Sequence, residues 1–348
     1  MDNGKAALCF SIPDEMTRKT LLNSILFLVS VAVGMLLCEV SARLLLFIRT
    51  PNGMVFDKEI VYTYKPYTTT ESFKLNNVGA VGDDIRIDKE KNEIRIFLLG
   101  ESTSFNETYV DTVRKLVSAR YGNYSVKVVS WGKPRYTSYT NKVNLEINIL
   151  QYKPDIIVLY MGINDNLYNT FPWLTGLPDI GYFNWHAGNE SIAAKLVKYF
   201  IIDKEIKSRP DFSANELRSK DIFRSNVTAI IEKARQNNIG VVLSTFAISY
   251  PSDDPLMVKL IKAREREMEH SWGKTNSTAI GVLEHNKILR QLSGQYGLPL
   301  ALNYELIPKN SQYFIDMCHF TGKGIELLGA NMADMILKSG YINLTATD

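Results

Sequence analysis

Three short segments, far apart in the sequence, carry residue types that could together perform nucleophilic catalysis. Ser102 follows the strand-like run 94–99, and Asp316 precedes His319 by three residues near the C-terminus. A serine hydroxyl is a poor nucleophile until a neighbouring imidazole takes its proton. A carboxylate then holds that imidazole in the right tautomer and stabilises its cation. Asn164 lies between these segments and offers a side-chain amide, so the chain has the parts of a serine hydrolase.

The elements that must position these residues are an alternation of strands and helices. Runs rich in Val, Ile and Leu predict strands at residues 94–99, 126–131, 155–161, 239–246 and 298–304. Helical patterns occupy residues 109–121, 139–152, 214–236, 255–269, 279–296 and 324–338. Apolar strands without strict alternation are typical of a parallel sheet that is covered on both faces. We therefore predict an α/β fold, a three-layer α/β/α (flavodoxin-like) domain with a five-stranded, mainly parallel sheet.

The predicted fold and the predicted chemistry agree in their location. In open α/β sheets, ligands bind beyond the C-terminal ends of the strands. Ser102 and Asn164 both fall just after predicted strand ends. We expect them to meet at one edge of the sheet.

The N-terminus carries an apolar run at residues 21–48, long enough to span a hydrocarbon core of about 30 Å. Glu39 and Arg43 fall near an interface, where long side chains reach water. A cleaved signal peptide is the alternative, because residues 40–42 resemble a cleavage site. Hydrophobicity that continues past Arg43 favours an uncleaved signal-anchor. We expect residues 1–20 to be a cytoplasmic tail, and the protein to cross the cell inner membrane once, with a periplasmic or otherwise extracytoplasmic catalytic domain.

The rest of the chain divides into a connector and one large domain. Residues 49–90 are polar and predict a juxtamembrane connector, and residues 91–340 predict the catalytic domain. Residues 166–210 interrupt the strand–helix rhythm with an aromatic-rich insertion that includes Trp173 and Trp185. The insertion either packs its aromatic side chains internally or forms a cap whose rings stack on a sugar or an acyl chain.

Composition excludes several other classes of protein. The formal charge of +3 is too small to argue for nucleic acid, and no basic run interleaved with aromatic residues occurs. Cys318 is the only cysteine of the predicted domain, so an intradomain disulfide is excluded. No set of residues has metal-ligand spacing. We therefore expect neither a metal nor a cofactor.

Taken in order, these segments resemble the SGNH (GDSL-like) hydrolase superfamily. The first block of that family matches residues 97–104, the third matches Gly162-Ile-Asn164-Asp165, and the last matches residues 316–324. The resemblance covers residues 94–338. With its N-terminal span, the chain is similar to bacterial membrane-anchored members, many of which act on envelope or exported polysaccharides.

The resemblance implies a role for each residue. Ser102 would be the nucleophile, His319 the general base and acid, and Asp316 the carboxylate that orients the imidazole. The main-chain N–H of Ser102 and the side-chain amide of Asn164 would donate to the oxyanion. Glu101, where the family often has Asp or Gly, is interpreted as a cap of the following helix.

The second block departs from the family pattern. Gly132 matches its first glycine, but Arg135 occupies the position of the oxyanion glycine. A backbone N–H survives the substitution, although a positive φ would be costly for arginine. The N–H of Arg135 is therefore the preferred third donor and that of Gly132 the alternative. The Arg135 side chain could instead direct a cation at an anionic substrate.

These inferences predict a serine esterase that works through an acyl-serine intermediate. Its expected substrate is an acylated carbohydrate, from which it removes O-acetyl or similar groups on an envelope or exported glycan. Envelope polysaccharide machinery is a candidate partner, and Trp173, Trp185 and Tyr136 are candidate substrate-binding residues. One alternative is an O-acyltransferase on the same site. Another is a non-catalytic anion- or glycan-binding module, which would leave Asp316 and His319 without a purpose.

Overall fold

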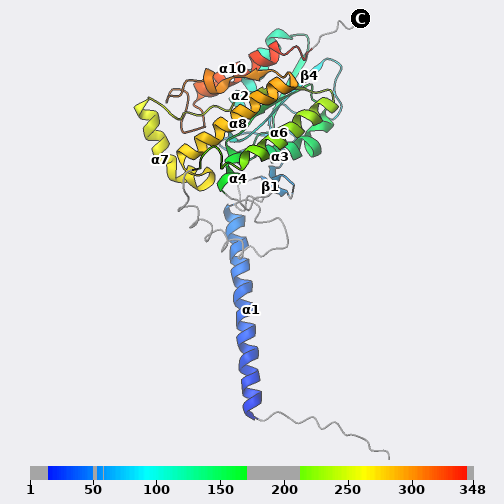
Figure 1. The fold of residues 1–348 in the computed structure, drawn as a ribbon. Helices are drawn as coiled ribbons and strands as arrows, with labels where there is room; N and C mark the ends of the chain where they lie inside the picture. The colour runs from blue at the N-terminus through cyan, green and yellow to red at the C-terminus, as the bar shows by residue number, and fades with distance from the viewer. Residues whose placement is uncertain (1–14, 50–52, 58, 171–211, 343–348) are drawn as a thin grey trace, which may run out of the picture. The chain divides into compact units, whose positions relative to one another are not determined.

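The computed structural model of the protein describes residues 15–49, 53–57, 59–170 and 212–342 (Figure 1). The chain forms two compact units, one with the N-terminal helix and one, from residue 51 onward, with the sheet. Most of the predicted insertion lies outside the described residues.

Helix α1 (Glu15–Arg49) is continuous and strongly apolar. Its stretch Arg18–Leu44 has 27 residues and contains an 18-residue window with a mean hydropathy of 2.4, which makes it long and apolar enough to cross a membrane. At 1.5 Å per residue it extends about 40 Å, more than a hydrocarbon core of about 30 Å. Arg43 Nη2 lies 2.8 Å from Glu39 Oε1, so these two charges near its end neutralise each other. A membrane anchor and a signal sequence both have these properties.

The second unit is built on a six-stranded sheet with the order β3-β5-β4-β6-β7-β8. The strands are β3 (Val81–Gly82), β4 (Glu93–Gly100), β5 (Ser125–Ser130), β6 (Ile156–Tyr160), β7 (Gly240–Ser244) and β8 (Leu300–Ala301). Strands β4 to β8 are parallel to their neighbours and correspond to the five predicted runs. The predicted α/β fold with a mainly parallel sheet is confirmed, and the five predicted strands are its parallel strands. Strand β3 adds a sixth, antiparallel strand at the edge beside β5.

The central strand β4 explains why the strand runs are continuously apolar. All eight of its residues are buried. Ile96 and Leu98 belong to one hydrophobic core, whereas Phe97 and Leu99 belong to the core on the opposite face. Because successive side chains of a strand point to opposite faces, a sheet covered on both sides needs apolar residues at every position.

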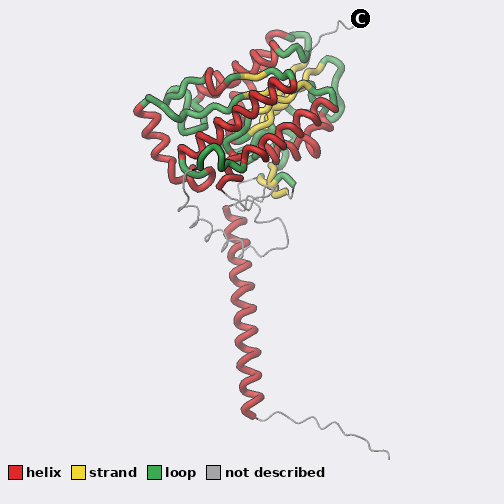
Figure 2. Tube along the Cα trace, in the orientation of Figure 1, coloured by secondary structure: helices red, strands yellow, loops and turns green. Residues whose placement is uncertain are grey.

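Helices cover both faces of the sheet, as Figure 2 shows. On one face lie α2 (Glu107–Arg120), α10 (Gly322–Lys338) and the buried residues of α7 (Pro255–Trp272). On the other lie α6 (Ser219–Gln236), α8 (Thr275–Tyr296), and α3 (Ser138–Asn144) with its continuation in η2 (Leu145–Ile149) and η3 (Leu150–Tyr152). The remaining short elements are η1 (Ser102–Ser104), η4 (Asn164–Asn166), α4 (Leu167–Thr170) and α9 (Asn303–Leu306).

The path of the chain places a topological switch point at the end of β4. The chain leaves β4, returns as β5 on one side of it, and then crosses to β6 on the other side. Where parallel connections diverge in this way, the C-terminal ends of the strands leave room for a ligand. The loops after β5, β4 and β6 therefore meet at one place.

The predicted connector at residues 49–90 belongs to the second unit and has structure of its own. It contains an antiparallel hairpin of β1 (Met54–Asp57) and β2 (Val61–Tyr64), followed by the edge strand β3. Leu75 is 1% exposed and belongs to the core beneath α2 and α10. The connector thus packs on the domain that it joins.

Candidate active site

Ser102 begins η1, directly after β4. A Cβ atom on Gly100 would lie 2.2 Å from Ser104 Oγ and 2.6 Å from the Tyr160 carbonyl oxygen, so this close turn requires glycine. Ser102 remains partly exposed while its neighbours Glu101 and Ser104 are buried. The turn therefore presents the Ser102 hydroxyl at the C-terminal edge of the sheet.

Ser102, His319 and Asp316 form one chain of hydrogen-bonding groups. Ser102 Oγ lies 2.9 Å from His319 Nε2. His319 Nδ1 lies 2.8 Å from Asp316 Oδ2. When Nδ1 carries the proton and donates it to the carboxylate, Nε2 offers its lone pair to the serine hydroxyl. This geometry allows the imidazole to accept the serine proton.

A tight turn brings Asp316 and His319 face to face although only two residues separate them. Asp316 Oδ1 accepts the backbone N–H groups of Cys318 at 2.9 Å and of His319 at 2.8 Å. Burial raises the pKa of Asp316, but its hydrogen bonds and charge interaction with His319 outweigh burial and lower that pKa to about 2. The Asp316 carboxylate is therefore ionised at any pH well above 2, and it can stabilise a protonated imidazole there.

Arg264 of α7 binds the other side of the same carboxylate. Its Nη1 lies 2.8 Å from Asp316 Oδ2, with the Arg264 side chain 50% exposed and that of Asp316 3% exposed. Asp316 thus accepts hydrogen bonds from Cys318, His319 and Arg264, which fix the plane of its carboxylate.

Asn164 follows β6 and is held at both ends of its side-chain amide. Its Nδ2 donates to the Tyr136 carbonyl oxygen at 3.0 Å, and its Oδ1 accepts from Trp272 Nε1 at 3.1 Å. The amide nitrogen carries two hydrogens, so one can donate to a bound oxyanion. Trp272 is the last residue of α7, and this helix therefore contacts Asn164 as well as Asp316.

Glu101 was expected to cap a helix, and the structure shows that this interpretation is wrong. Its side chain makes no cap hydrogen bond to η1. Instead Glu101 Oε1 accepts the N–H groups of Gly162 at 2.9 Å and of Asn164 at 3.2 Å. Burial, followed by the nearby charge of Asp165, raises the pKa of Glu101 well above its usual value. The Glu101 side chain thus holds the loop that carries Asn164.

His285 of α8 supports that loop from the other side. Its Nδ1 lies 2.6 Å from the Gly162 carbonyl oxygen, and its Nε2 lies 2.8 Å from Ser219 Oγ. These partners assign the proton to Nδ1, which donates to the carbonyl, and make Nε2 the acceptor. Burial lowers the pKa of His285 to about 4, so this imidazole is neutral and structural.

The second-block loop combines a close packing point with a strained residue. A Cβ on Gly132 would lie 2.8 Å from the Glu101 carbonyl oxygen, so Gly132 lets this loop approach the nucleophile turn. Arg135 has φ 64°, in the left-handed region that favours glycine. The family pattern places a glycine there, and the chain keeps that conformation despite the larger residue. The backbone at Arg135 is therefore compatible with the donor role that the resemblance implies for its N–H.

Of the three predicted substrate-binding residues, the structure describes only Tyr136. Trp173 and Trp185 lie outside the described residues. Tyr136 is 1% exposed, and its hydroxyl donates to the Tyr62 carbonyl oxygen at 2.6 Å. The prediction that the Tyr136 side chain binds substrate is therefore not supported, because protein atoms surround it.

Cys318 lies between Asp316 and His319 in the sequence, and its side chain is buried in the hydrophobic core. Asp316, Cys318 and His319 could each offer one ligand atom to a metal ion, and these three atoms lie within 4.8 Å of one another. No other set of three or more His, Cys, Asp or Glu residues in the described part of the chain does so. Burial, and then the charge of Asp316, raises the pKa of the Cys318 thiol well above its usual value. A protonated thiol is a poor metal ligand, because metals bind the thiolate, and Asp316 and His319 are already engaged with each other.

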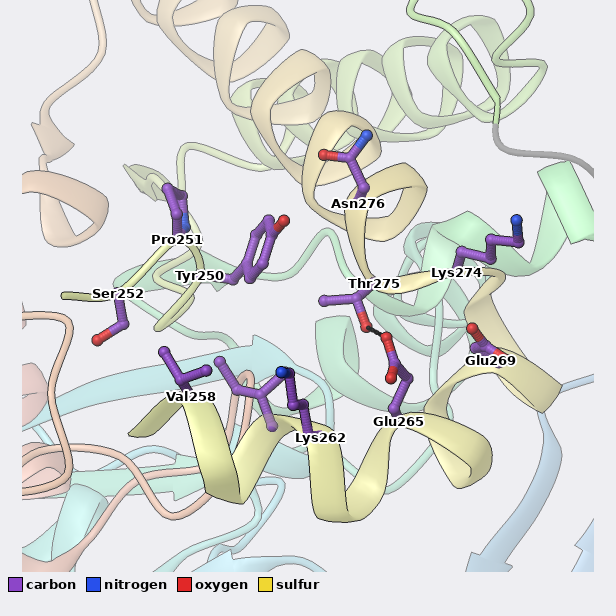
Figure 3. Close-up of a pocket in the computed structure, with 11 residues that line it drawn as sticks. Tyr250, Pro251, Ser252, Val258, Lys262, Glu265, Glu269, Lys274, Thr275 and Asn276 are labelled. Atoms are coloured by element: carbon purple, nitrogen blue, oxygen red, sulfur yellow. Dashed lines mark hydrogen bonds between the residues drawn. The ribbon is translucent and has the colours of Figure 1, made fainter. Parts of the chain in front are cut away.

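A surface pocket of about 350 Å³ lies beside α7 (Figure 3). The loop at Tyr250, the exposed face of α7 and the start of α8 line it. Its charges are mixed, and Thr275 Oγ1 donates to Glu265 Oε1 at 3.0 Å across it. None of the predicted catalytic residues lines this pocket.

Comparisons with known proteins concern the fold. No family model matches the chain, and no curated protein matches it. Among solved structures, a GDSL-like lipase from Bacteroides thetaiotaomicron is 16% identical with a TM-score of 0.43, covering 72% of this chain and 91% of that one. A lipase/acylhydrolase from Enterococcus faecalis is 18% identical with a TM-score of 0.43, covering 70% and 95%. An acetylxylan esterase from Geobacillus stearothermophilus is 14% identical with a TM-score of 0.43, covering 70% and 94%.

Four residues that contact the candidate site were missed or misread in the sequence. Glu101 could have been found, because an ionisable side chain directly after a buried strand must find a partner. Arg264, Trp272 and His285 lie on helices whose patterns give no sign of their contacts. Only the packing of α7 and α8 against the loops reveals them.

Proposed function

We propose that this chain is a membrane-anchored serine esterase that works through an acyl-serine intermediate. The observation that carries the proposal is the chain from Ser102 Oγ through His319 to Asp316. It lies at the C-terminal ends of parallel strands, where such sheets bind ligands. Its likeness in sequence blocks to the SGNH hydrolases points the same way.

The proposed reaction begins with attack of Ser102 Oγ on the acyl carbonyl carbon. His319 Nε2 takes the hydroxyl proton, and ionised Asp316 stabilises the imidazolium cation that results. The carbonyl oxygen becomes an oxyanion, which would accept hydrogen bonds from the N–H groups of Ser102 and Arg135 and from Asn164 Nδ2. Such donors act strongly because they are fixed before the charge develops.

Collapse of the tetrahedral intermediate releases the alcohol, to which His319 returns the proton. Water then attacks the acyl-serine by the same route, and the carboxylic acid leaves. We assign the alcohol to a glycan and the acyl group to acetate or a similar short acid. An apolar anchor and extracytoplasmic placement suit an esterase that acts on envelope or exported polysaccharide.

The test is ester hydrolysis by the full-length chain and by Ser102→Ala. We expect the substitution to lower kcat for an activated acetate ester by roughly 10⁴–10⁶-fold, the range seen when a triad nucleophile or its partners are removed. Ser104→Ala is the matched control, because that hydroxyl is buried in the same turn and has no hydrogen-bond partner. Equal activity of Ser102→Ala and the wild type would refute the proposal.

Substrate and acceptor are tested separately. An O-acetylated glycan incubated with the wild type should release free acetate in a Ser102-dependent manner. Appearance of acetate on an added sugar acceptor instead would identify an acyltransferase, in which a sugar hydroxyl replaces water. Covalent labelling of Ser102 by a fluorophosphonate would exclude a purely binding role.

A further inference from the structure

The hairpin β1–β2 contacts the loop that carries Arg135. Tyr62 Oη of β2 donates to the Pro134 carbonyl oxygen at 2.6 Å. In return, Tyr136 Oη donates to the Tyr62 carbonyl oxygen at 2.6 Å. The two rings pack edge to face with centroids 5.6 Å apart. Both side chains are buried, at 2% and 1% exposure, so water cannot replace these two hydrogen bonds.

The two bonds bracket the strained part of the loop. Pro134 and Tyr136 are the residues on either side of Arg135, whose φ is 64°. Lys133 adds a second cost, because its amine is fully buried without a hydrogen-bond partner and lies 5.4 Å from the Trp131 ring centre. A backbone held in such a state persists only when surrounding contacts over-determine it. The hairpin supplies such contacts on both sides of Arg135.

The same strand and the same loop reach the other donors. The Tyr136 carbonyl oxygen accepts from Asn164 Nδ2 at 3.0 Å. Tyr64, two residues after Tyr62 and therefore on the same face of β2, stacks on Phe105 with ring centres 5.7 Å apart. The Phe105 N–H in turn donates to the Ser102 carbonyl oxygen at 3.1 Å. Strand β2 thus packs against the nucleophile turn as well as the second-block loop.

We propose that the hairpin β1–β2 is a positioning element of the oxyanion hole, with Tyr62 and Tyr136 as its positioning residues. This inference rests on the proposed esterase function and extends it to a segment that follows α1 after only a few residues. The Tyr62 hydroxyl binds the backbone before Arg135, and the Tyr136 hydroxyl ties the residue after Arg135 to β2. Together they keep the Arg135 N–H directed at the oxyanion. The part of the Tyr62 side chain that this role requires is its hydroxyl group.

The experiment compares Tyr62→Phe and Tyr136→Phe in the full-length protein with the wild type. Each variant keeps the ring and removes one hydroxyl donor. We expect kcat for an activated ester to fall about fivefold in each, with KM unchanged, because a net hydrogen bond of ordinary strength is lost from transition-state positioning. Tyr341→Phe is the matched control: its hydroxyl donates to the Val241 carbonyl oxygen at 3.2 Å, near the start of β7 and away from the C-terminal strand ends. It should leave kcat unchanged.

Hydrogen exchange of the wild type and Tyr62→Phe supplies a readout that does not depend on turnover. The amides of Arg135 and Tyr136 should exchange faster in the variant, whereas those of α10 should not change. A kcat in Tyr62→Phe equal to that of Tyr341→Phe would overturn the proposal, and so would unchanged exchange at residues 131–136. Absence of Ser102-dependent turnover in the wild type would refute the esterase function instead, and exchange would still decide whether the hairpin holds the loop.

Discussion

Replacing Glu101 by alanine or by glutamine separates the roles of its shape and its charge. In the wild type, Glu101 Oε1 accepts the N–H groups of Gly162 and Asn164 inside the protein. Glu101→Ala leaves both donors buried without an acceptor, at about 1–3 kcal/mol each. The free energy of unfolding should therefore fall by roughly 2–6 kcal/mol. Glu101→Gln keeps an acceptor oxygen in place and removes only a charge that burial disfavours, so it should cost less than about 1 kcal/mol.

Activity should follow the same division. Glu101→Ala frees the loop that carries Asn164. We therefore expect kcat to fall by nearly as much as when one oxyanion donor is removed, about 10²–10³-fold. Glu101→Gln should retain most of the wild-type kcat. The measurements are urea unfolding at pH 7 and hydrolysis of an activated ester by both variants.

The stability of the protein should also depend on pH through Glu101. Its folded pKa lies above the ordinary value of 4.5, so between these two pKa values the folded chain keeps a proton that the unfolded chain loses. This group therefore lowers stability as pH rises through that window. Glu101→Gln should remove that slope. Equal destabilisation by glutamine and alanine would refute the reasoning, because it would mean that the ionised carboxylate is required.

Three further changes test other contacts of the site. His285 has a pKa of about 4 in the folded protein against an ordinary value of 6.5, so its contribution to the free energy of unfolding is present above pH 6.5 and is lost as pH falls toward 4. Urea unfolding of the wild type should show a loss of about 3 kcal/mol over this range, which His285→Gln should lack. An equal dependence of stability on pH in both proteins would contradict this. Arg135→Gly keeps the backbone N–H and relieves the left-handed strain, so thermal unfolding should show a gain of up to about 1 kcal/mol and kcat should stay within about twofold, whereas a tenfold fall would show that the guanidinium matters. Arg264→Gln removes one partner of Asp316 from a half-exposed position, so steady-state kinetics should show a loss of kcat of about threefold, and no change would limit Arg264 to a surface role.

The sheet and the placement of Asp316 against His319 could be predicted because their signals are local. Each parallel strand is a short apolar run, and the turn at Asp316 places its carboxylate against His319 within four residues. Ser102 and Asn164 could be placed because strand ends in a parallel sheet share one edge. The observed positions at the ends of β4 and β6 follow from this rule.

The groups that hold the site could not be predicted, because their contacts join elements distant in sequence. Trp272 reaches Asn164 across 108 residues, and His285 reaches Gly162 across 123. A tryptophan at the end of a helix and a buried histidine have the same local pattern whether they pack or orient a neighbour. Glu101 was misread for a related reason: an acidic residue at a helix start resembles a cap until its actual acceptor geometry is seen.

The hairpin β1–β2 has a practical consequence for making a water-soluble form of this protein. A fragment that starts at residue 91 would retain the five parallel strands and Ser102, Asp316 and His319, and it would be the natural choice from the sequence alone. That fragment lacks Tyr62, and it also exposes the core that Leu75 covers. Cutting between the end of α1 and Met54 removes the apolar helix and spares both. The expression boundary therefore belongs near residue 51, about forty residues before the first strand of the parallel sheet.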